Sequence, residues 1–298
     1  MMVWVGIDIG GTNTRVLLVN DEGRILGRVK MATRGAAQRV QYLTEVVAAV
    51  SQLVKGQPLA GIGIGVPGLV QKDGLLNRTV NCSVLADNQL RTQLEDTFRV
   101  PVRQGNDATM AALGEHWLGA GAGRETLMML TIGTGLGSGL ILQGVPYHGA
   151  HGFAVECGHL PVVPDGIVCP CGNQGCLEQY VSASALARFA GTRDAAEAAQ
   201  RAAAGDPQAL AGFETMGGWL GIGLCGIVNL FDPDMIVIGG GVSASFDLFM
   251  PAARRELVKR SFNPYGEQLS IVPAACGDDA GALGAVRYVM QVNAEVTA

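Results

Sequence analysis

One histidine and three cysteines lie within eighteen residues of a glycine-rich stretch. They are His159, Cys169, Cys171 and Cys176. Thiolate sulfur and imidazole nitrogen are the usual ligands of closed, four-coordinate zinc sites, and Gly172 and Gly175 would let the backbone turn around an ion. Close cysteines can also be buried in a core or form a disulfide, but the Cys-X-Cys spacing disfavours a local disulfide. Because four protein ligands leave no open position, we predict a structural zinc site.

Two carboxylates flank this cysteine cluster. Glu156 lies just before it and Glu178 lies just after it. A loop stapled by a metal would hold both side chains rigidly. A rigid pair of hydrogen-bond acceptors suits a polyhydroxylated ligand.

A glycine turn near the start of the chain has the composition of a phosphate-binding loop. The sequence DIGGTNT covers Asp8, Gly10, Gly11, Thr12 and Thr14. Glycines expose backbone N–H groups to an anion, the threonine hydroxyls can donate to phosphate oxygens, and an aspartate can hold a hydrated magnesium ion. The chain has neither a Walker lysine nor a GxGxxG that opens a helix, so P-loop and Rossmann sites are disfavoured. An ordinary hairpin turn is the alternative.

Two further glycine turns occur in the second half of the chain. TIGTGLGSG contains Gly133, Thr134 and Gly135, and the run Gly239, Gly240 and Gly241 follows the apolar segment MIVI. The first turn could bind phosphates, and the second would let a flat base approach the backbone closely. The three turns together predict a nucleotide site.

Asn106 and Asp107 stand between a predicted strand and a predicted helix. Asp107 could be the N-cap of that helix. It could also be a general base that accepts the proton of a sugar hydroxyl as the oxygen attacks a γ-phosphoryl group. Both roles are compatible.

The surrounding pattern predicts an α/β fold with two lobes. We expect strands at 3–9, 15–20, 24–31, 62–66, near 102, 127–132, 139–142, 145–147 and 235–238. We expect helices at 40–54, 90–98, 107–117, 184–190, 195–204, 207–229 and 280–292. Each half opens with strand, glycine turn and strand, so we predict a small α/β lobe at 1–108 completed by a helix at 280–298, and a large lobe with the zinc loop at 109–279.

Composition narrows the function further. The chain has 298 residues, a net charge of -5 and 43 glycines, far above the average glycine share of about 7%. The charge offers no basic field for nucleic acid. The N-terminus lacks the features of a signal peptide, and the apolar stretch 215–231 is too short and too rich in glycine to span a bilayer convincingly. We therefore expect a cytoplasmic protein that binds neither membranes nor nucleic acid.

These motifs resemble the ROK sugar kinases, members of the actin-like ATPase superfamily with a ribonuclease H-like fold. The matching segments are DIGGTNT, GIGVPG (63–68), GND (105–107), TIGTGLGSG, GAHGFAVECGH (149–159), CPCGNQGCLE and IGGGV (238–242). The resemblance covers essentially the whole chain.

The resemblance implies a role for each motif. Asp107 would be the catalytic base, and Gly68, Asn106, Glu156, His159 and Glu178 would bind the sugar. His159 would ligate zinc through one ring nitrogen and contact the sugar with the other. The glycine turns would bind ATP, with magnesium accompanying it, and family members commonly form dimers or tetramers.

Two departures from the family pattern lie near the sugar side. The stretch TVNCSVLAD, with Cys82 and Ala86, lacks a tryptophan found in many glucokinases, and Val155 replaces a usual glycine. GLVQKDG and GAHG resemble allose kinase, whereas VVPDG resembles bacterial glucokinase. We expect phosphorylation of the 6-hydroxyl of glucose, with allose, fructose or N-acylmannosamine as alternatives.

Non-catalytic relatives give the competing hypothesis. Some are sugar-responsive repressors with a DNA-binding domain ahead of the ATPase-like region. Here the first strand is expected at Val3, so we expect no such domain. A zinc hydrolase would need an open metal site or an HExxH helix, and neither is seen.

Overall fold

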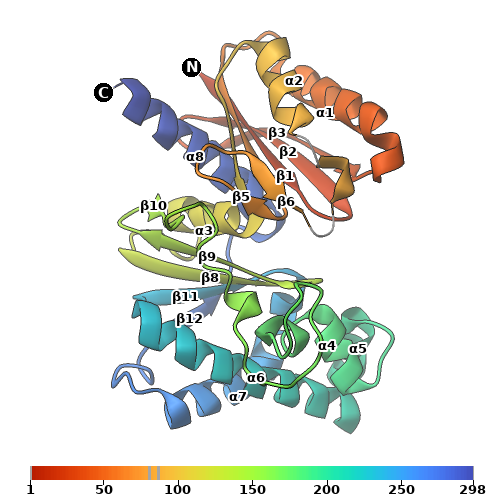
Figure 1. The fold of residues 1–298 in the computed structure, drawn as a ribbon, viewed down its shortest axis with the longest axis vertical. Helices are drawn as coiled ribbons and strands as arrows, with labels where there is room; N and C mark the ends of the chain where they lie inside the picture. Colours follow the sequence, from red (N-terminus) through yellow and green to blue (C-terminus); the bar gives the residue numbers. More distant parts are fainter. Residues whose placement is uncertain (1, 80–81, 86–87, 298) are drawn as a thin grey trace. The chain divides into compact units, whose positions relative to one another are not determined.

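The computed structural model describes residues 2–79, 82–85 and 88–297. Figure 1 shows the helices and strands of these residues. The chain forms two compact units. Unit 1 comprises residues 1–123, 139–155 and 275–298, and unit 2 comprises residues 124–138 and 156–274. Ala86, one of the family departures, lies outside the described residues.

Unit 1 is built on a five-stranded sheet in the order β3-β2-β1-β4-β7. The strands are β1 (Val3–Ile9), β2 (Asn13–Asn20), β3 (Ile25–Ala32), β4 (Leu59–Val66) and β7 (Val102–Asn106). β1, β4 and β7 run parallel, while β2 and β3 pair antiparallel. The parallel strands therefore bring their carboxyl ends to one edge of the sheet.

Helices cover both faces of this sheet. They are α1 (Arg39–Val54), α2 (Gln89–Phe98), α3 (Asp107–Leu118) and α8 (Ala280–Thr297). Val16 and Leu18 of β2 belong to the core that includes α1 and α2, whereas Leu17 and Val19 pack with α8. This alternation is the period of a strand that is buried on both faces. A Cβ at Gly6 would lie 2.0 Å from the backbone oxygen of Ala282, so glycine lets α8 rest directly on the sheet.

The second sheet has the order β10-β9-β8-β11-β12. Its strands are β8 (Thr126–Ile132), β9 (Leu136–Leu142), β10 (Val145–Pro146), β11 (Met235–Gly239) and β12 (Ser270–Pro273). β8, β11 and β12 run parallel. This order is equivalent to that of the first sheet, as duplicated halves predict.

The helices of unit 2 pack mainly on one another. They are α4 (Ala183–Ala190), α5 (Ala195–Ala203), α6 (Pro207–Phe231) and α7 (Phe246–Arg260). A Cβ at Gly217 or Gly221 of α6 would lie within 2.3 Å of a backbone oxygen of α7, so these glycines allow close helix packing. Short 3-10 turns complete the chain at η1 (Ala36–Gln38), η2 (Ser83–Leu85), η3 (Cys157–His159), η4 (Leu177–Gln179), η5 (Gly241–Ser245) and η6 (Gly277–Asp279).

The longest helix, α6, is long and apolar enough to cross a membrane by length and composition alone. In the structure, 61% of its most apolar window is buried. Phe213, Met216, Leu220 and Leu224 of this helix are fully buried. This packing is typical of the central helix of a folded unit.

The unit boundaries differ from those expected from the sequence. α3 belongs to unit 1 because it packs along α8. A Cβ at Gly114 of α3 would lie 2.1 Å from the oxygen of Ala280, and one at Gly284 of α8 would lie 1.6 Å from the oxygen of Met110. Glycine on both helices thus permits an unusually close crossing, a feature that hydrophobic periodicity does not report.

Several elements were not expected. They are α7, β12 and the small hairpin of β5 (Leu69–Val70) and β6 (Leu76–Arg78). α7 contains Pro251, which usually marks a break in a helical pattern, but here it lies in the second turn. β12 and the hairpin strands are too short to show a period.

Candidate functional site

The Asn106-Asp107 pair stands where β7 meets α3. Asn106 is the N-cap, because its Oδ1 accepts from the Thr109 N–H at 3.0 Å, and Asp107 is the first helical residue. The proposed capping role of Asp107 therefore belongs to its neighbour. Asn106 also donates through Nδ2 to the carbonyl of Gly68 at 3.1 Å. The side-chain amide of Asn106, at the end of β7, thus contacts Gly68, which follows β4; both residues are predicted to bind the sugar.

The backbone conformation at position 68 requires glycine. Its φ is +130°, and a Cβ there would lie 2.1 Å from the oxygen of Arg78. β4 and β7 pair in parallel with Gly65 beside Gly105 and Val66 beside Asn106. Gly68 and Asp107 consequently lie just beyond the carboxyl ends of adjacent strands, which is the usual location of ligands in open α/β sheets.

Asp8 lies at the same edge of the sheet, on β1. Its side chain is 17% exposed, and its Oδ2 is 4.0 Å from Arg15 Nη1. Burial, and then the charge of Asp107, raise the pKa of Asp8 to about 7, while Arg15 opposes the rise. Asp278 adds to the negative charge and pairs with Arg15. An excess of carboxylates at this point suits a divalent cation.

The turn after Asp8 separates the predicted phosphate contacts into two groups. Gly11 and Thr12 are exposed and Gly10 is half-buried. Thr14 is fully buried, and its hydroxyl bonds to Tyr42 Oη at 2.6 Å and to Thr33 Oγ1 at 2.9 Å. The Thr14 hydroxyl is therefore engaged in the core, and Thr12 is the better placed of the two for a phosphate oxygen.

The two glycine turns of unit 2 follow neighbouring parallel strands. Thr131 of β8 pairs with Gly239 of β11. Gly240 has a φ of +82°, and a Cβ there would lie 2.4 Å from the oxygen of Ile132. Thr134 and Gly241 are exposed. The structure thus brings the residues 133–135 and 239–241 to one edge of the second sheet.

The predicted zinc ligands converge within unit 2. The ligand atoms of His159, Cys169, Cys171 and Cys176 all lie within 4.8 Å of one another. Cys171 Sγ is 3.7 Å from Cys176 Sγ, and Cys169 Sγ is 3.8 Å from His159 Nδ1. Tetrahedral ligands about 2.3 Å from zinc lie about 3.8 Å apart. The donor set and its spacing therefore fit the ion, with Nδ1 as the histidine donor.

Glu178 is held against the first glycine turn of unit 2. Its Oε2 accepts from the Leu136 N–H at 2.9 Å, and a Cβ at Gly135 would lie 2.3 Å from the same oxygen. Glu178 is the second residue of η4 and lies two positions after Cys176. A predicted sugar carboxylate and a predicted nucleotide turn are thus in direct contact.

Glu156 directly precedes η3, and the charge of Glu178 affects its pKa. Glu156 is exposed, but the surrounding protein atoms still raise the pKa of its carboxyl group, and the charge of Glu178 raises it further. The next residue, Cys157, donates its N–H to the buried hydroxyl of Ser138 at 3.0 Å. Ser138 and Arg15 were not predicted from the sequence. The role of Ser138 depends on a tertiary contact with Cys157, and that of Arg15 depends on the register of the β1–β2 hairpin, which places it opposite Asp8.

Val155, one of the family departures, has a left-handed backbone. Its φ is +68°, a conformation that costs a β-branched residue free energy and that glycine adopts readily. The strained residue lies directly before Glu156. This backbone explains in physical terms why glycine suits the position.

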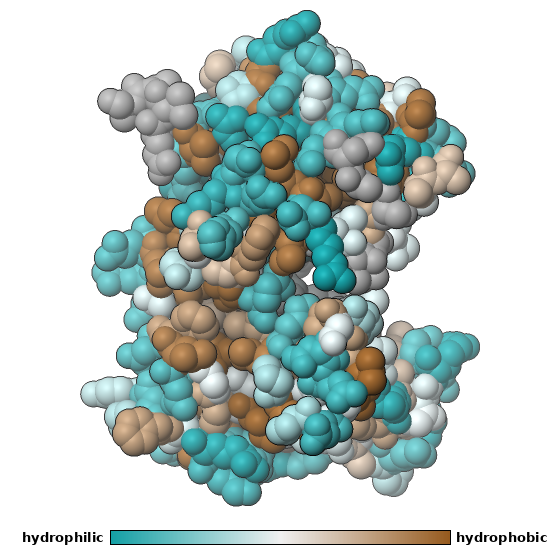
Figure 2. Space-filling view, in the orientation of Figure 1, coloured by the Kyte–Doolittle hydropathy of each residue, from teal (hydrophilic) through white to brown (hydrophobic). Residues whose placement is uncertain are grey.

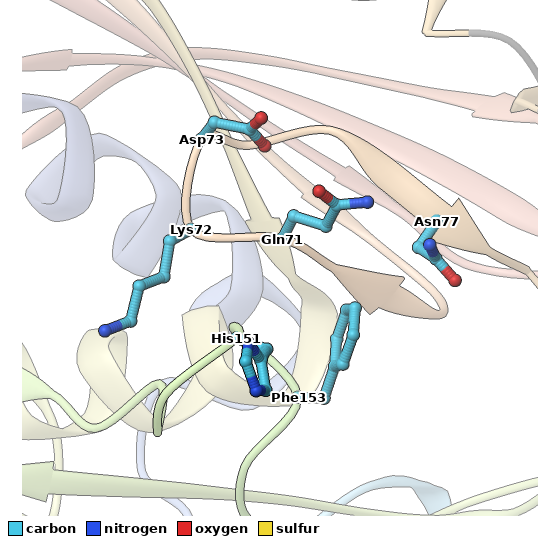
Figure 3. A pocket seen from close by; sticks show the side chains of 6 residues that line it. All are labelled: Gln71, Lys72, Asp73, Asn77, His151 and Phe153. Carbon is cyan, nitrogen blue, oxygen red and sulfur yellow. The ribbon is translucent and has the colours of Figure 1, made fainter.

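A cavity of about 440 Å³ lies beside the β5–β6 hairpin in unit 1. It is lined by Gln71, Lys72, Asp73, Asn77, His151 and Phe153 (Figure 3). None of the sequence-predicted site residues lines it. Some of its lining residues are close in sequence to predicted sugar residues: Gln71 lies three positions after Gly68, and Phe153 lies three positions before Glu156.

Comparison with known proteins identifies the family. The family model described as "ROK family" matches residues 4–292. The chain belongs to the ROK family. It is 32% identical to a glucokinase of Halalkalibacterium halodurans over 97% of this chain and 95% of that protein.

Other ROK proteins include both kinases and regulators. A Streptomyces griseus ROK glucokinase, solved in complex with glucose and AMPPNP, is 33% identical and superposes with a TM-score of 0.81 over 97% of this chain and 99% of that one. The xylose repressor of Bacillus subtilis is 30% identical over 94% of this chain, which spans 75% of the repressor. The predicted α/β sugar-kinase fold is therefore confirmed as that of the ROK family.

Proposed function

We propose that this ROK protein is a hexose kinase that transfers the γ-phosphoryl group of ATP to the 6-hydroxyl of glucose. The observation that carries the proposal is the Asn106-Asp107 pair, fixed at the start of α3 and bonded to Gly68. Full-length similarity to glucokinases supports it. Allose, fructose and N-acylmannosamine are the alternative acceptors.

Asp107 would act as the general base. The N-cap and the helix fix its position, so its carboxylate can accept the proton of the attacking hydroxyl as the oxygen bonds to phosphorus and ADP departs. Asn106, Gly68, Glu156, Glu178 and the Nε2 atom of His159 would bind the other sugar groups. Several acceptors in fixed positions select among hexoses by the direction of each hydroxyl.

ATP would be bound by the exposed glycine turns. Gly10, Gly11, Thr12, Gly133, Thr134 and Gly135 would contact its phosphates. The segment 239–241 would lie against the adenosine, because exposed Gly241 leaves space for a flat base. Asp8 would hold the magnesium ion, which neutralises charge on the phosphates when bound.

Zinc would be structural. The Cys169, Cys171, Cys176 and His159 donors would fill its coordination and thereby fix the adjacent positions of Glu156 and Glu178. We place the enzyme in the cytoplasm, where ATP is available, and we expect a dimer or tetramer, to be measured by light scattering during size-exclusion chromatography.

A non-catalytic sugar sensor is the second candidate, since the xylose repressor shares the same region. ADP release in the presence of a hexose panel separates the two hypotheses. A kinase produces ADP with one sugar in preference to the others. A protein that binds a sugar without any ADP release would instead be a sensor.

Replacing Asp107 with asparagine tests the base directly. We expect a fall in kcat of about 10²- to 10⁴-fold, the range typical of general-base catalysis, with sugar binding retained in calorimetry. Asp247→Asn is the matched control, because Asp247 is exposed on α7, and its replacement should leave kcat unchanged. A near-normal kcat in the Asp107 variant would remove it as the base.

A further inference from the structure

A second cavity of about 510 Å³ lies in unit 1 and contains none of the proposed catalytic residues. Its wall is formed by the β5–β6 turn, α2, β7, β10 with the segment after it, and α8. The charged and polar lining includes Lys72, Arg91, Arg103, Gln104 and His148. We call this cavity the basic pocket.

Positive charge in the basic pocket exceeds negative charge. Arg91 is neutralised by Glu95 at 3.1 Å. Lys72 and Arg103 have no carboxylate within ion-pair distance among the described residues; Arg103 donates only to the carbonyl of Val102, at 3.2 Å. Asp73, the single acidic residue of the wall, uses its Oδ1 to accept the Leu75 N–H at 2.9 Å within the turn.

The rest of the wall is fixed and partly apolar. Arg91 donates through Nη1 to the carbonyl of Asp73 at 2.8 Å, which ties the turn to α2. Buried Gln104 donates to the carbonyl of Gly74 at 3.2 Å. Tyr288 packs edge-on against His148, with ring centroids 5.7 Å apart. Pro146 and Val292 supply apolar surface beside these rings.

We infer that the basic pocket binds a small phosphorylated metabolite, a phosphate monoester whose charged group meets Lys72 and Arg103. An arginine fork and an ammonium group together match a dianionic phosphate better than a single carboxylate. The volume exceeds what a bare phosphate needs, and the Tyr288, Pro146 and Val292 surface accommodates the compact body of the ester.

The basic pocket adjoins the first cavity, which lies beside the β5–β6 hairpin that follows Gly68. Figure 3 shows that Lys72 points away from Asn77 and Phe153, although all three line the first cavity. Lys72 and Asp73 line both cavities. Gly68 immediately precedes this hairpin. A ligand that orders Lys72 therefore acts on the turn shared by the two cavities.

Burial and the charge of Lys72 both lower the pKa of His148. His148 is thus kept neutral beside the uncompensated cations. A neutral ring can accept a hydrogen bond as well as donate one, which suits the hydroxyl groups of a sugar phosphate or a nucleoside phosphate.

Isothermal titration of the full chain tests the inference. Inorganic phosphate, glucose 6-phosphate and AMP are titrated separately, first into the free protein and then into protein saturated with glucose and a non-hydrolysable ATP analogue. We expect a binding event that persists in the saturated protein and weakens at least about tenfold in the double variant Lys72→Ala/Arg103→Ala, because hydrogen bonds to charged groups are lost. The probe that binds best identifies the source of the phosphate.

The control variant is Lys259→Ala, which removes an exposed positive charge in unit 2 and should leave the affinity unchanged. Arg103→Gln alone serves if the double variant does not fold, as judged by circular dichroism. The inference is overturned if no probe binds, or if affinity is the same in the pocket variants as in wild type. Because the readout is binding, the result is independent of whether the protein proves to be a kinase.

Discussion

At the scale of single residues, the acidic cluster at the carboxyl end of β1 is expected to lower the stability of the fold when no cation is bound. Asp8 is mostly buried, and Asp107 and Asp278 add negative charge around it. Arg15 only partly compensates. A carboxylate in this position is stabilised when a cation binds.

The pKa of Asp8 predicts a pH-dependent stability. Folding raises this pKa from 3.8 to about 7, so between these pH values the folded state holds a proton that the unfolded state has released. The free energy of unfolding therefore falls as the pH rises from about 4 to 7, and the cost is complete above 7. Asp8→Asn removes this cost.

We expect Asp8→Asn to be as stable as wild type near pH 4 and more stable by about 1 to 3 kcal/mol at pH 8. Urea unfolding of the magnesium-free and nucleotide-free protein at the two pH values measures the difference. Asp73→Asn, in an exposed turn, is the control and should show no such trend. Equal stabilities of Asp8→Asn and wild type at pH 8 would contradict the proposed electrostatic cost.

The left-handed backbone of Val155 predicts that glycine at this position is more stabilising than alanine, the reverse of the usual order. A left-handed backbone costs an L-residue about 1 to 2 kcal/mol, and Val155 has a φ of +68°. Val155→Gly and Val155→Ala both remove most of the side chain, but only glycine removes the strained Cβ. We expect the glycine variant to be the more stable of the two by about 1 kcal/mol in urea unfolding.

The neighbouring Ala154 provides the matched control. It does not have a positive φ, so Ala154→Gly should be destabilising in the ordinary way, because glycine gains more conformational entropy on unfolding. If the alanine and glycine variants at position 155 followed that same ordinary order, the strain assigned to Val155 would be absent.

At the scale of elements, the segment from η3 to η4 has little secondary structure of its own. Between Leu160 and Cys176 the described structure contains turns and isolated bridges, such as Val168 with Gln174. We expect such a segment to depend on its cysteine cluster for order. We therefore expect metal to determine the position of Glu178.

Cys171→Ser tests this dependence. We expect the variant to lose about one zinc ion per chain and to show faster protease cleavage within 160–176, since a closed site needs all four donors. Metal content by atomic emission spectroscopy is the first measurement. Cys225→Ser is the control, because the thiol of Cys225 donates to the carbonyl of Leu257 at 3.5 Å outside the cluster. Unchanged zinc content in Cys171→Ser would exclude the assigned site.

The elements also show which parts of the fold a sequence can predict. The strands that open each half and the helices α1, α3 and α6 carry long apolar patterns and were located to within a few residues. The helix α7 was missed because Pro251 interrupts its pattern. The assignment of α3 to unit 1 depends on glycine contacts with α8, which are not encoded in a local period.

At the scale of the whole molecule, motif spacing accounts for only part of the local structure around the predicted site residues. Motif spacing predicted the glycine turns, the Asn106-Asp107 pair and the cysteine cluster, which form local structures. It could not predict that the Thr14 hydroxyl would be bonded to Tyr42 in the core, because that contact joins residues 28 positions apart. The position of Arg15 opposite Asp8 follows from the register of the β1–β2 hairpin, whereas its pairing with Asp278 depends on tertiary packing.

The chain passes between the two units near a single buried carboxylate. Glu115 of α3 is 0% exposed. Its oxygens accept from the N–H groups of Ala120 at 2.8 Å, Ala275 at 3.0 Å and Cys276 at 2.7 Å. Residues 123 and 275 end and begin segments of unit 1, so Glu115 fastens two of the connecting segments to one helix.

Glu115→Gln should therefore loosen both connections. The amide nitrogen of glutamine would meet backbone N–H donors, which leaves at least one buried donor without an acceptor, and we expect a loss of about 1 to 3 kcal/mol in the free energy of unfolding. Amide hydrogen exchange should accelerate at residues 120, 275 and 276. Glu45→Gln is the control, because Glu45 is a partly exposed partner of Arg34, and its replacement should leave the exchange rates of these three amides unchanged. Exchange rates unchanged at these three amides would show that the connecting segments are held by other contacts.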